Sequence, residues 1–546
     1  MIMDSFLGLF DPGEESQLPP EPQLGNVEYK LKLVNPSKLR FEHLVTQLKW
    51  RLREGHGEAI YEIGVEDSGL LTGLSEEEMT DSLETLELMA RRLGATTTIL
   101  RERAVDPGRQ VAEVLVRKVP DDQHNIEVRV AVMGSADAGK STLLGVLTQG
   151  QLDNGRGRAR LNMFRHLHEV QSGRTSSISH EILGFNSQGE VMNYSELVTA
   201  EEICENSTKL VTFMDLAGHR KYLRTTVQGL TGYSPHYVML VVSGRAGVLG
   251  MTREHLALAI ALDVPLFVTI TKTDLGSPQE TLNCLKTILQ SPGCRRVPFV
   301  VKNEDDAITA GSNQLADNIV PVFLVSSVNG EGLELLTRFL HVLPPGISHK
   351  EKERLEQEPC EFQIDECFRV PDIGPVVGGL LTKGTVNEGT KLVLGPLDSG
   401  EFVPVEVQSI HRNKAPCRTV RASQSASLGL DCAPVALRAG MVLISTDQCP
   451  TGCLFFQATV CVLFHSTAIH PGFQMTVHIG NVRQTARIEG IMATGGIQTN
   501  EKASVLFRFL RHPEYVRVGM RLLFREGTTK GIGKITQVFP LEVHAG

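Results

Sequence analysis

A glycine-rich motif in this chain has the residue types and spacing that bind a phosphate chain. Residues 134–141 read Gly-Ser-Ala-Asp-Ala-Gly-Lys-Ser and match the pattern G-x-x-x-x-G-K-[ST]. In such a loop, backbone N–H groups surround the β-phosphate, and the positive end of the following helix faces it. Lys140 would contact β- and γ-phosphate oxygens, and the Ser141 hydroxyl would bind Mg²⁺. The residues that this motif predicts around the phosphates are Gly134, Ser135, Ala136, Asp137, Ala138, Gly139, Lys140, Ser141 and Thr142.

The flanking residues predict the elements that position this loop. The apolar alternation from Ile126 to Met133 is typical of a strand, and the apolar run after Thr142 begins a helix. A match of this length is only moderately specific when it stands alone. The motifs that follow it therefore decide the interpretation.

A second motif, at residues 215–219, reads Asp-Leu-Ala-Gly-His and follows the apolar run 210–214. An aspartate at the end of a buried strand can hold Mg²⁺ through a water molecule, and the N–H of Gly218 can contact a γ-phosphate. We therefore expect Asp215, through water, and Gly218 at the phosphate end of the site.

Two further motifs suit a guanine base. Residues 265–270 read as a buried strand and lead into Thr-Lys-Thr-Asp at 271–274. The Asp274 carboxylate can accept hydrogen bonds from N1–H and the N2 amine of guanine, whereas adenine offers neither donor. Another strand pattern, 320–325, precedes a Ser-Ser-Val loop that could close over O6 of the base. The residues predicted to bind the base are Thr271, Lys272, Asp274, Ser326, Ser327 and Val328.

The order of these motifs carries more weight than any one of them. Each short match taken alone is commonly a coincidence. Together they occur in the correct order, each after an apolar run, and open α/β sheets bind ligands at the carboxyl ends of their strands. The sequence therefore predicts an α/β domain, with a mostly parallel sheet and helices on both faces, that binds GTP or GDP with Mg²⁺.

The histidine in Asp-x-x-Gly-His, where other GTPases have glutamine, carries a resemblance to a family. The chain is similar to translational GTPases of the elongation factor Tu and elongation factor 1-alpha type, and within them to the GTP-binding protein 1/2 group. Residues 252–255, Thr-Arg-Glu-His, and Thr271 in place of the commoner asparagine fit that group. The resemblance extends from about residue 126 to the C-terminus.

This resemblance implies catalytic roles for His219, Thr175 and Asp137. His219 would orient the attacking water once a ribosome docks, and its imidazolium could stabilise developing negative charge. The alternative is a histidine that only caps the following helix. Thr175, in a switch I segment at 169–180, would be a Mg²⁺ ligand together with Ser141. Asp137 would hold a monovalent cation beside the phosphates.

The chain departs from the family pattern around the catalytic histidine. Relatives flank that histidine with a hydrophobic pair, whereas this chain has Ala136 and Arg174 there. Arg174 could place a positive charge near the γ-phosphate or contact ribosomal RNA phosphate, and the alternative is a solvated surface arginine. Ser135 and Ala138 also replace histidines that many relatives carry.

Composition favours a globular protein of several domains. Apolar residues make up 41% and charged residues 21% of the chain, which are ordinary values. We find no long apolar run and no signal-peptide pattern, and so expect a cytoplasmic protein without a membrane partner. The net charge is −9, yet residues 453–546 hold ten Lys/Arg against five Glu. This basic region predicts an RNA-facing surface, and the alternative is a solvated barrel face.

Changes in pattern divide the chain into parts. Short apolar runs broken by glycine after residue 361 predict two β-barrels, which resemble domains two and three of elongation factors. Ser75 with Glu78 predicts a capped helix in an N-terminal region that could bind a partner or fold over the GTPase domain. The polar stretch 302–314 predicts a surface insertion, of a kind that is often partner-specific. The predicted parts are a disordered acidic, proline-rich tail at 1–25, a small α+β domain of unknown role at 26–122, a P-loop GTPase domain at 123–345, a linker at 346–360, and barrels at 361–450 and 451–546.

The resemblance implies hydrolysis of GTP to GDP and phosphate, stimulated by the ribosome. The cargo would be tRNA or a tRNA-mimicking rescue factor, and the setting would be elongation or the rescue of stalled ribosomes. The alternative is a GTP-dependent interaction switch in RNA turnover or signalling, with RNA-decay machinery as its partner and negligible catalytic turnover. Ala136 and Arg174 keep that alternative open.

Overall fold

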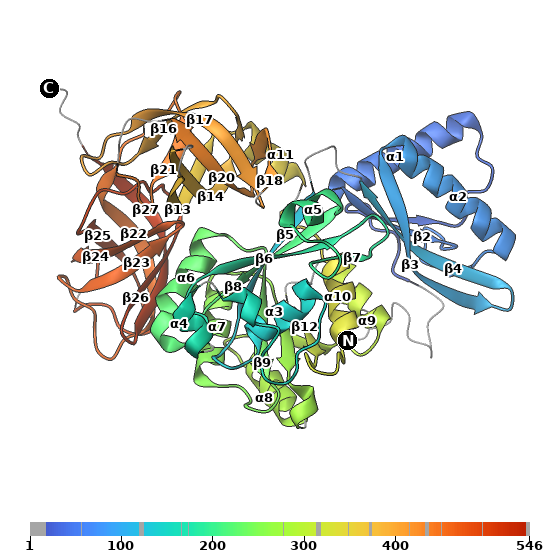
Figure 1. The fold of residues 1–546 in the computed structure, drawn as a ribbon, viewed down its shortest axis with the longest axis horizontal. Coiled ribbons are helices and arrows are strands. Elements are labelled where there is room, and N and C mark those ends of the chain that lie inside the picture. The colour runs from blue at the N-terminus through green and yellow to red at the C-terminus, as the bar shows by residue number, and fades with distance from the viewer. Residues whose placement is uncertain are drawn as a thin grey trace. The chain divides into compact units, whose positions relative to one another are not determined.

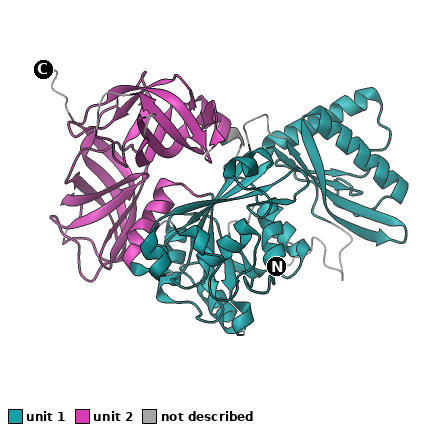
Figure 2. Cartoon of the chain, in the orientation of Figure 1, with its two compact units in different colours: residues 1–220, 236–351 teal, residues 221–235, 352–546 magenta. Residues whose placement is uncertain are grey.

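The chain forms two compact units, which Figure 2 shows in different colours. The first unit is residues 1–220 with 236–351, and the second is residues 221–235 with 352–546. Within the part that is described, no helix is both long and apolar enough to cross a membrane. The computed structural model describes residues 18–55, 57–118, 125–164, 166–172, 174–276, 278–312, 318–347, 349–370, 374–413, 415–431, 436–448, 450–493 and 495–541.

The first unit begins with a small sheet that two helices cover on one face (Figure 1). The strand order is β1-β2-β4-β3. Alternate strand side chains, such as Tyr61, share one apolar core with Leu48 and Met89 of the helices. The predicted capping box is confirmed, because Ser75 and Glu78 exchange hydrogen bonds at the start of α2. The elements are β1 (Val27–Lys30), α1 (Lys38–Glu54), β2 (Glu58–Ile63), α2 (Glu76–Arg92), β3 (Ala95–Asp106) and β4 (Arg109–Lys118).

Leu18 and Glu21 hold the described part of the segment before this sheet, which corrects the prediction of disorder for residues 18–25 of the tail at 1–25. Leu18 is 3% exposed, and its N–H donates to the Gly69 carbonyl at 2.6 Å. Glu21 forms an ion pair with Arg51 at 2.7 Å. A proline-rich segment can be ordered when it contacts other parts of the protein. Here those contacts are made by residues that lie later in the chain. The rest of that predicted tail, residues 1–17, lies outside the described residues.

The α/β domain predicted at 123–345 is built on an eight-stranded sheet in the order β11-β12-β10-β9-β5-β8-β6-β7. The strands from β11 to β8 pair in parallel, whereas β6 and β7 add antiparallel pairs at one edge. The strands are β5 (Ile126–Met133), β6 (Ser179–Phe185), β7 (Val191–Met192), β8 (Lys209–Asp215), β9 (Tyr237–Ser243), β10 (Leu266–Thr271), β11 (Val297–Val300) and β12 (Ile319–Leu324). The helices of this domain in the first unit are α3 (Lys140–Gln149), α4 (Leu167–Ser172), α5 (Ala200–Glu205), α7 (Gly250–Ala261), α8 (Gln279–Leu289), α9 (Glu304–Ser312) and α10 (Leu333–Val342).

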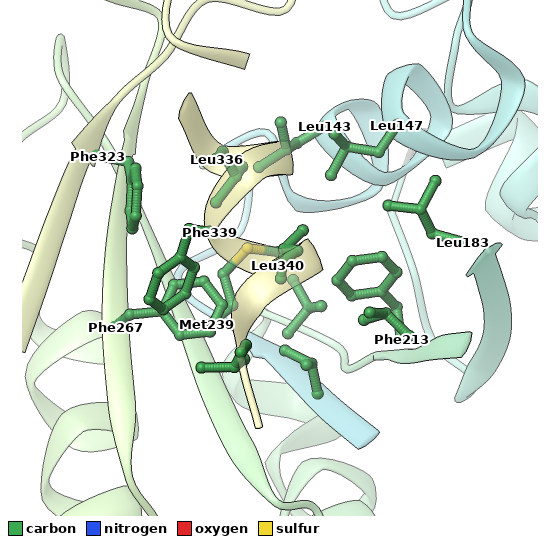
Figure 3. Close-up of a cluster of buried hydrophobic side chains, with 14 of the residues drawn as sticks. Leu143, Leu147, Leu183, Phe213, Met239, Phe267, Phe323, Leu336, Phe339 and Leu340 are labelled. Atoms are coloured by element: carbon green, nitrogen blue, oxygen red, sulfur yellow. The ribbon is translucent and has the colours of Figure 1, made fainter. Parts of the chain in front are cut away.

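An apolar core fixes helix α3 to this sheet. Figure 3 shows Leu143 of α3 near Leu336 of α10, with aromatic side chains from the strands around α10. The ring centroid of Phe339 lies 5.0 Å from that of Phe267 and 4.9 Å from that of Phe323, distances typical of favourable aromatic pairs. Because α3 begins at Lys140, this packing also fixes the end of the phosphate-binding loop.

The second face of the small N-terminal sheet packs against α9 and α10. Ile60 and Leu115 form one buried cluster with Ile308 of α9 and Val342 of α10. The prediction of a surface insertion at 302–314 is therefore wrong in part. Glu304–Ser312 form helix α9, in which Ile308 packs with the N-terminal sheet, while Ala307 and Ala310 join the core of the α/β domain.

Buried charges join the same two domains. The Arg117 guanidinium donates to Glu58 at 2.7 Å and to the His341 carbonyl at 3.0 Å. The Lys209 ammonium donates to the carbonyls of His341 and Leu343 within its own domain, at 2.6 and 2.5 Å, and lies 3.9 Å from Glu58 of the N-terminal sheet. Burial lowers the pKa of Lys209 to about 7, although Glu58 opposes that shift. Such groups are costly to separate from their partners, so they fix the N-terminal domain to β8 and α10.

The second unit holds two barrels. In the first, the β16–β17 pairing closes the sheet β16-β21-β13-β14-β20-β17, and in the second the order is β22-β25-β24-β23-β26-β27. The predicted fold class is thus confirmed. The elements are α11 (His349–Gln357), within the predicted linker, β13 (Glu361–Val370), β14 (Gly374–Lys383), β15 (Thr385–Asn387), β16 (Lys391–Gly395), β17 (Val403–Arg412), β18 (Ala415–Pro416), β19 (Thr419–Arg421), β20 (Gln424–Asp431), β21 (Val442–Ser445), β22 (Cys453–Phe464), β23 (Gln474–Ile479), β24 (Val482–Ile491), β25 (Lys502–Phe509), β26 (Arg521–Glu526) and β27 (Thr529–Pro540).

Helix α6 (Leu223–Gly232) groups with the barrels, although it follows the Asp-x-x-Gly-His motif in sequence. The Gln228 side chain accepts a hydrogen bond from Arg483 at 3.1 Å. A Cβ on Gly232 would come within 2.8 Å of the Asp365 Oδ1 atom. A larger residue at this position would therefore separate the end of α6 from β13.

Candidate guanine nucleotide site

The loop between β5 and α3 is held tightly against the sheet. A Cβ on Gly134 would lie 2.1 Å from the Val241 carbonyl oxygen, so only glycine permits this close approach. The Lys140 ammonium donates to the carbonyls of Gly134 and Ser135 at 3.2 and 3.1 Å. Burial lowers the pKa of Lys140, while Asp215 and Asp137 act in the opposite direction.

The residues predicted to hold Mg²⁺ come together at the start of α3. The Ser141 Oγ atom lies 2.8 Å from Thr175 Oγ1 and 2.5 Å from Asp215 Oδ2. Thr175 Oγ1 also lies 3.4 Å from the same carboxylate oxygen. Burial raises the pKa of Asp215, and the charge of Glu169 adds to this, whereas Lys140 and the hydroxyl donors lower it.

This group of atoms has the chemistry that Mg²⁺ requires. Mg²⁺ prefers a small number of hard oxygen ligands and is commonly shared between protein and nucleotide phosphates. Two hydroxyls and one carboxylate beside the Lys140 ammonium satisfy that preference. When bound, the ion would neutralise negative charge on phosphate oxygens.

The Asp-x-x-Gly-His loop lies directly against the phosphate-binding loop. A Cβ on Gly218 would come within 2.3 Å of Lys140 Nζ and 2.7 Å of the Ala136 nitrogen. The backbone at Gly218 is therefore close both to the Lys140 side chain and to the loop between β5 and α3. His219 follows on this loop and is partly exposed, and Arg174 is exposed on switch I.

A histidine that sequence reasoning left without a role supports this loop. His255 of α7 is fully buried, and its Nδ1 accepts a hydrogen bond from the Gly134 N–H at 3.0 Å. His255 belongs to the Thr-Arg-Glu-His stretch, so the family resemblance contained the signal. Neither local pattern nor spacing could show that its partner is a backbone N–H of the phosphate-binding loop.

The predicted base-binding residues meet where β10 and β12 end. Thr271 Oγ1 donates to the Ala138 carbonyl at 2.5 Å, and the Lys272 ammonium donates to the Asp137 carbonyl at 2.7 Å. The exposed Asp274 carboxylate accepts a 2.7 Å hydrogen bond from Ser326 Oγ. These bonds tie both base-binding loops to the phosphate-binding loop or to each other.

The remaining predicted residues lie around these groups. Asp137 is exposed, with a φ of +61°, and Val328 is 40% exposed. The Ser327 carbonyl accepts from the Asp153 N–H at 2.8 Å. Thr142 follows Ser141 in the first turn of α3. A cation near Asp137 stays a prediction from the resemblance.

Comparisons with known proteins place this site in a family. Residues 126–345 match the elongation factor Tu GTP binding domain. The chain is 59% identical to human GTP-binding protein 2, over 95% of this chain and 88% of that protein. It is 46% identical to GTP-binding protein 1 of Xenopus laevis, over 94% of this chain and 79% of that protein. The chain belongs to the GTP-binding protein 1/2 family. As a member of this family, it carries a GTP-binding domain of the elongation factor type.

A solved structure of lower sequence identity shares the fold of this family member. Translation elongation factor SelB from Methanococcus maripaludis, in complex with the GTP analogue GppNHp, is 18% identical and covers 77% of this chain and 81% of its own. The TM-score is 0.54. At this identity the likeness concerns the fold alone.

Proposed function

We propose that this chain is a Mg²⁺-dependent GTPase of the translational type, which hydrolyses GTP to GDP and phosphate when it engages a ribosome. The observation that carries the proposal is the meeting of Ser141, Thr175 and Asp215 beside Lys140. Hydroxyl and carboxylate oxygens next to a buried ammonium suit a metal-bound triphosphate. The family gives the nucleotide its identity as GTP.

Each end of the nucleotide would have its own set of residues. Lys140 and the loop N–H groups would bind the β- and γ-phosphates. Asp274, oriented by Ser326, would accept from N1–H and N2 of guanine. His219 would orient the attacking water, so that catalysis depends on positioning and charge rather than on a covalent intermediate.

The proposed partners are the ribosome and tRNA or a tRNA-mimicking rescue factor, in elongation or rescue in the cytoplasm. The charge of the last barrel supports an RNA-facing role, because several of its basic residues are exposed on strands and loops. Those exposed residues are Arg483, Lys502, Arg508, Arg511, Arg521 and Lys534.

A second function is favoured by Ala136 and Arg174, which form the gate around His219 at the positions where relatives have a hydrophobic pair. A methyl group at Ala136 and an exposed guanidinium at Arg174 exclude water less well than a hydrophobic pair. A chain with such a gate could bind GTP and act as a switch in RNA turnover or signalling, with RNA-decay machinery as its partner and negligible turnover.

GTP hydrolysis with and without ribosomes separates the two functions. For a translational GTPase, ribosomes should stimulate hydrolysis by the unaltered chain, and His219→Ala should lose that stimulation while it still binds GTP. Arg174→Ala in the same assay tests whether the guanidinium contributes. GTP binding with no stimulation by ribosomes would favour the switch.

A further inference from the structure

Glu169 is a buried acidic residue in a segment that otherwise faces water. It lies in the short helix α4 and is 1% exposed, whereas Val170 beside it is 47% exposed. A carboxylate is rarely buried unless hydrogen bonds compensate for its lost hydration. The partners of Glu169 therefore indicate why it is there.

Both oxygens of Glu169 accept hydrogen bonds from backbone N–H groups. The Oε1 atom accepts from the N–H groups of Ser176 and Ser177 at 2.6 and 2.9 Å. The Oε2 atom accepts from the N–H of His166 at 3.1 Å. One side chain thus joins the residue before α4 to the residues that directly follow Thr175.

The hydroxyl groups of the same loop strengthen this arrangement. Ser176 Oγ lies 2.7 Å and Ser177 Oγ 3.0 Å from Glu169 Oε1. Ser176 Oγ also lies 2.7 Å from His168 Nε2. Since one carboxylate oxygen has few lone pairs, the N–H groups and hydroxyls share it, and a neutral side chain would satisfy them less well.

We propose that Glu169 is a positioning residue that holds switch I closed, so that the Thr175 hydroxyl faces Ser141 and Asp215. The inference rests on the proposed GTP-binding function, because it assigns Thr175 to the metal and the γ-phosphate. Thr175 immediately precedes the two N–H groups that Glu169 binds, so fixing those groups fixes the peptide that carries Thr175.

The test compares Glu169→Ala and Glu169→Gln with Glu202→Ala in the full chain. Glu202 is a matched control, because its carboxylate also accepts from backbone N–H groups, those of Val198 and Thr199 at 2.8 and 3.3 Å. Hydrogen exchange of the Ser176 and Ser177 amides is measured without nucleotide, with GDP, and with Mg²⁺ and a non-hydrolysable GTP analogue. Affinities for GDP and for the analogue are measured in parallel.

In Glu169→Ala, exchange at Ser176 and Ser177 should become at least about tenfold faster, because a charge-assisted acceptor is lost. Affinity for the GTP analogue should fall about tenfold, and affinity for GDP should change less than about twofold. Glu169→Gln should show intermediate exchange rates and an intermediate affinity for the analogue, since its amide oxygen can replace one carboxylate oxygen. Glu202→Ala should speed exchange only at Val198 and Thr199.

Unchanged exchange at Ser176 and Ser177 in Glu169→Ala would overturn the proposal, and so would equal losses of GDP and analogue affinity. If the alanine variant does not fold, the glutamine variant decides by the same two measurements. If the unaltered chain binds no guanine nucleotide, the proposed function fails, while exchange without nucleotide still tests the role of Glu169.

Discussion

The Ser326 hydroxyl donates a hydrogen bond of 2.7 Å to the Asp274 carboxylate, across 52 residues of sequence. The two loops meet because β10 and β12 are parallel neighbours, so that both end at the same edge of the sheet. The bond occupies one carboxylate oxygen and orients the exposed carboxylate group.

Asp274→Asn should shift the preference of the chain from GTP toward xanthosine triphosphate, because an amide can donate where the carboxylate accepted. Competition between the two nucleotides for binding measures the shift. Ser326→Ala serves as the comparison: it should weaken GTP binding about fivefold, as expected for one lost hydrogen bond, without changing base preference. Retained GTP preference in Asp274→Asn would contradict the assignment of Asp274.

Thr271→Asn should slow the release of GDP. The single hydroxyl hydrogen of Thr271 is directed at the Ala138 and Val242 carbonyls, at 2.5 and 3.3 Å, so none is left for the base. Asparagine would add a second donor and could bind both the loop and the base, for about tenfold slower release. Stopped-flow release of fluorescent GDP measures this, and slow release from the unaltered chain would count against the idea.

His255→Ala should weaken GTP and GDP binding to similar degrees. The change leaves the Gly134 N–H without its acceptor in a buried position, at a cost of about 1–3 kcal/mol. Binding calorimetry with each nucleotide provides the measurement. Arg253→Ala, on the same helix but exposed, should bind both nucleotides normally. A normal affinity in His255→Ala would show that the loop keeps its shape without this bond.

Asp365→Asn should remove a pH dependence from the stability of the second unit. Burial raises the pKa of Asp365 from 3.8 to about 8, and neither carboxylate oxygen has a hydrogen-bond partner among the described residues. Because the pKa of Asp365 is higher in the folded state than in the unfolded state, protonation of Asp365 favours folding. This contribution is fully present at a pH below the unfolded pKa of 3.8, and it is lost as the pH rises toward about 8. The expected slope is roughly 1.4 kcal/mol per pH unit across that interval.

Native-state hydrogen exchange in β13 and β14 between pH 5 and 8, corrected for the intrinsic rate, measures this slope. Asp431→Asn, at the exposed end of β20, is the matched control and should keep the slope of the unaltered chain. A slope that persists in Asp365→Asn would place its origin elsewhere.

The sequence predicts which residues meet in the candidate nucleotide site, because each motif lies at or after the end of the strand that positions it. Ser141 and Asp215 follow this rule, since parallel strands deliver their ends to one edge. The roles of Glu169 and His255 could not be predicted in this way. Their partners are backbone N–H groups, which every residue except proline carries, and so no residue type marks them.

Contacts between distant segments were predicted least well. The capping box of Ser75 and Glu78 is local, and the sequence shows it directly. The burial of Leu18 and the covering of α9 depend on segments far away in the chain. Polarity alone indicated a solvated surface for 302–314, because the apolar residues of α9 are few and mostly small, Ala307, Ile308 and Ala310.

The docking of the N-terminal sheet on α9 and α10 has a consequence for any shortened form of the chain. Without residues 1–118, Ile308 and Val342 would meet water, and Lys209 would lose the nearby Glu58 carboxylate, 3.9 Å away. Such a fragment would have an exposed apolar surface that is buried in the intact chain. The N-terminal sheet and helix α9 thus depend on each other, and removal of either would expose apolar side chains of the other.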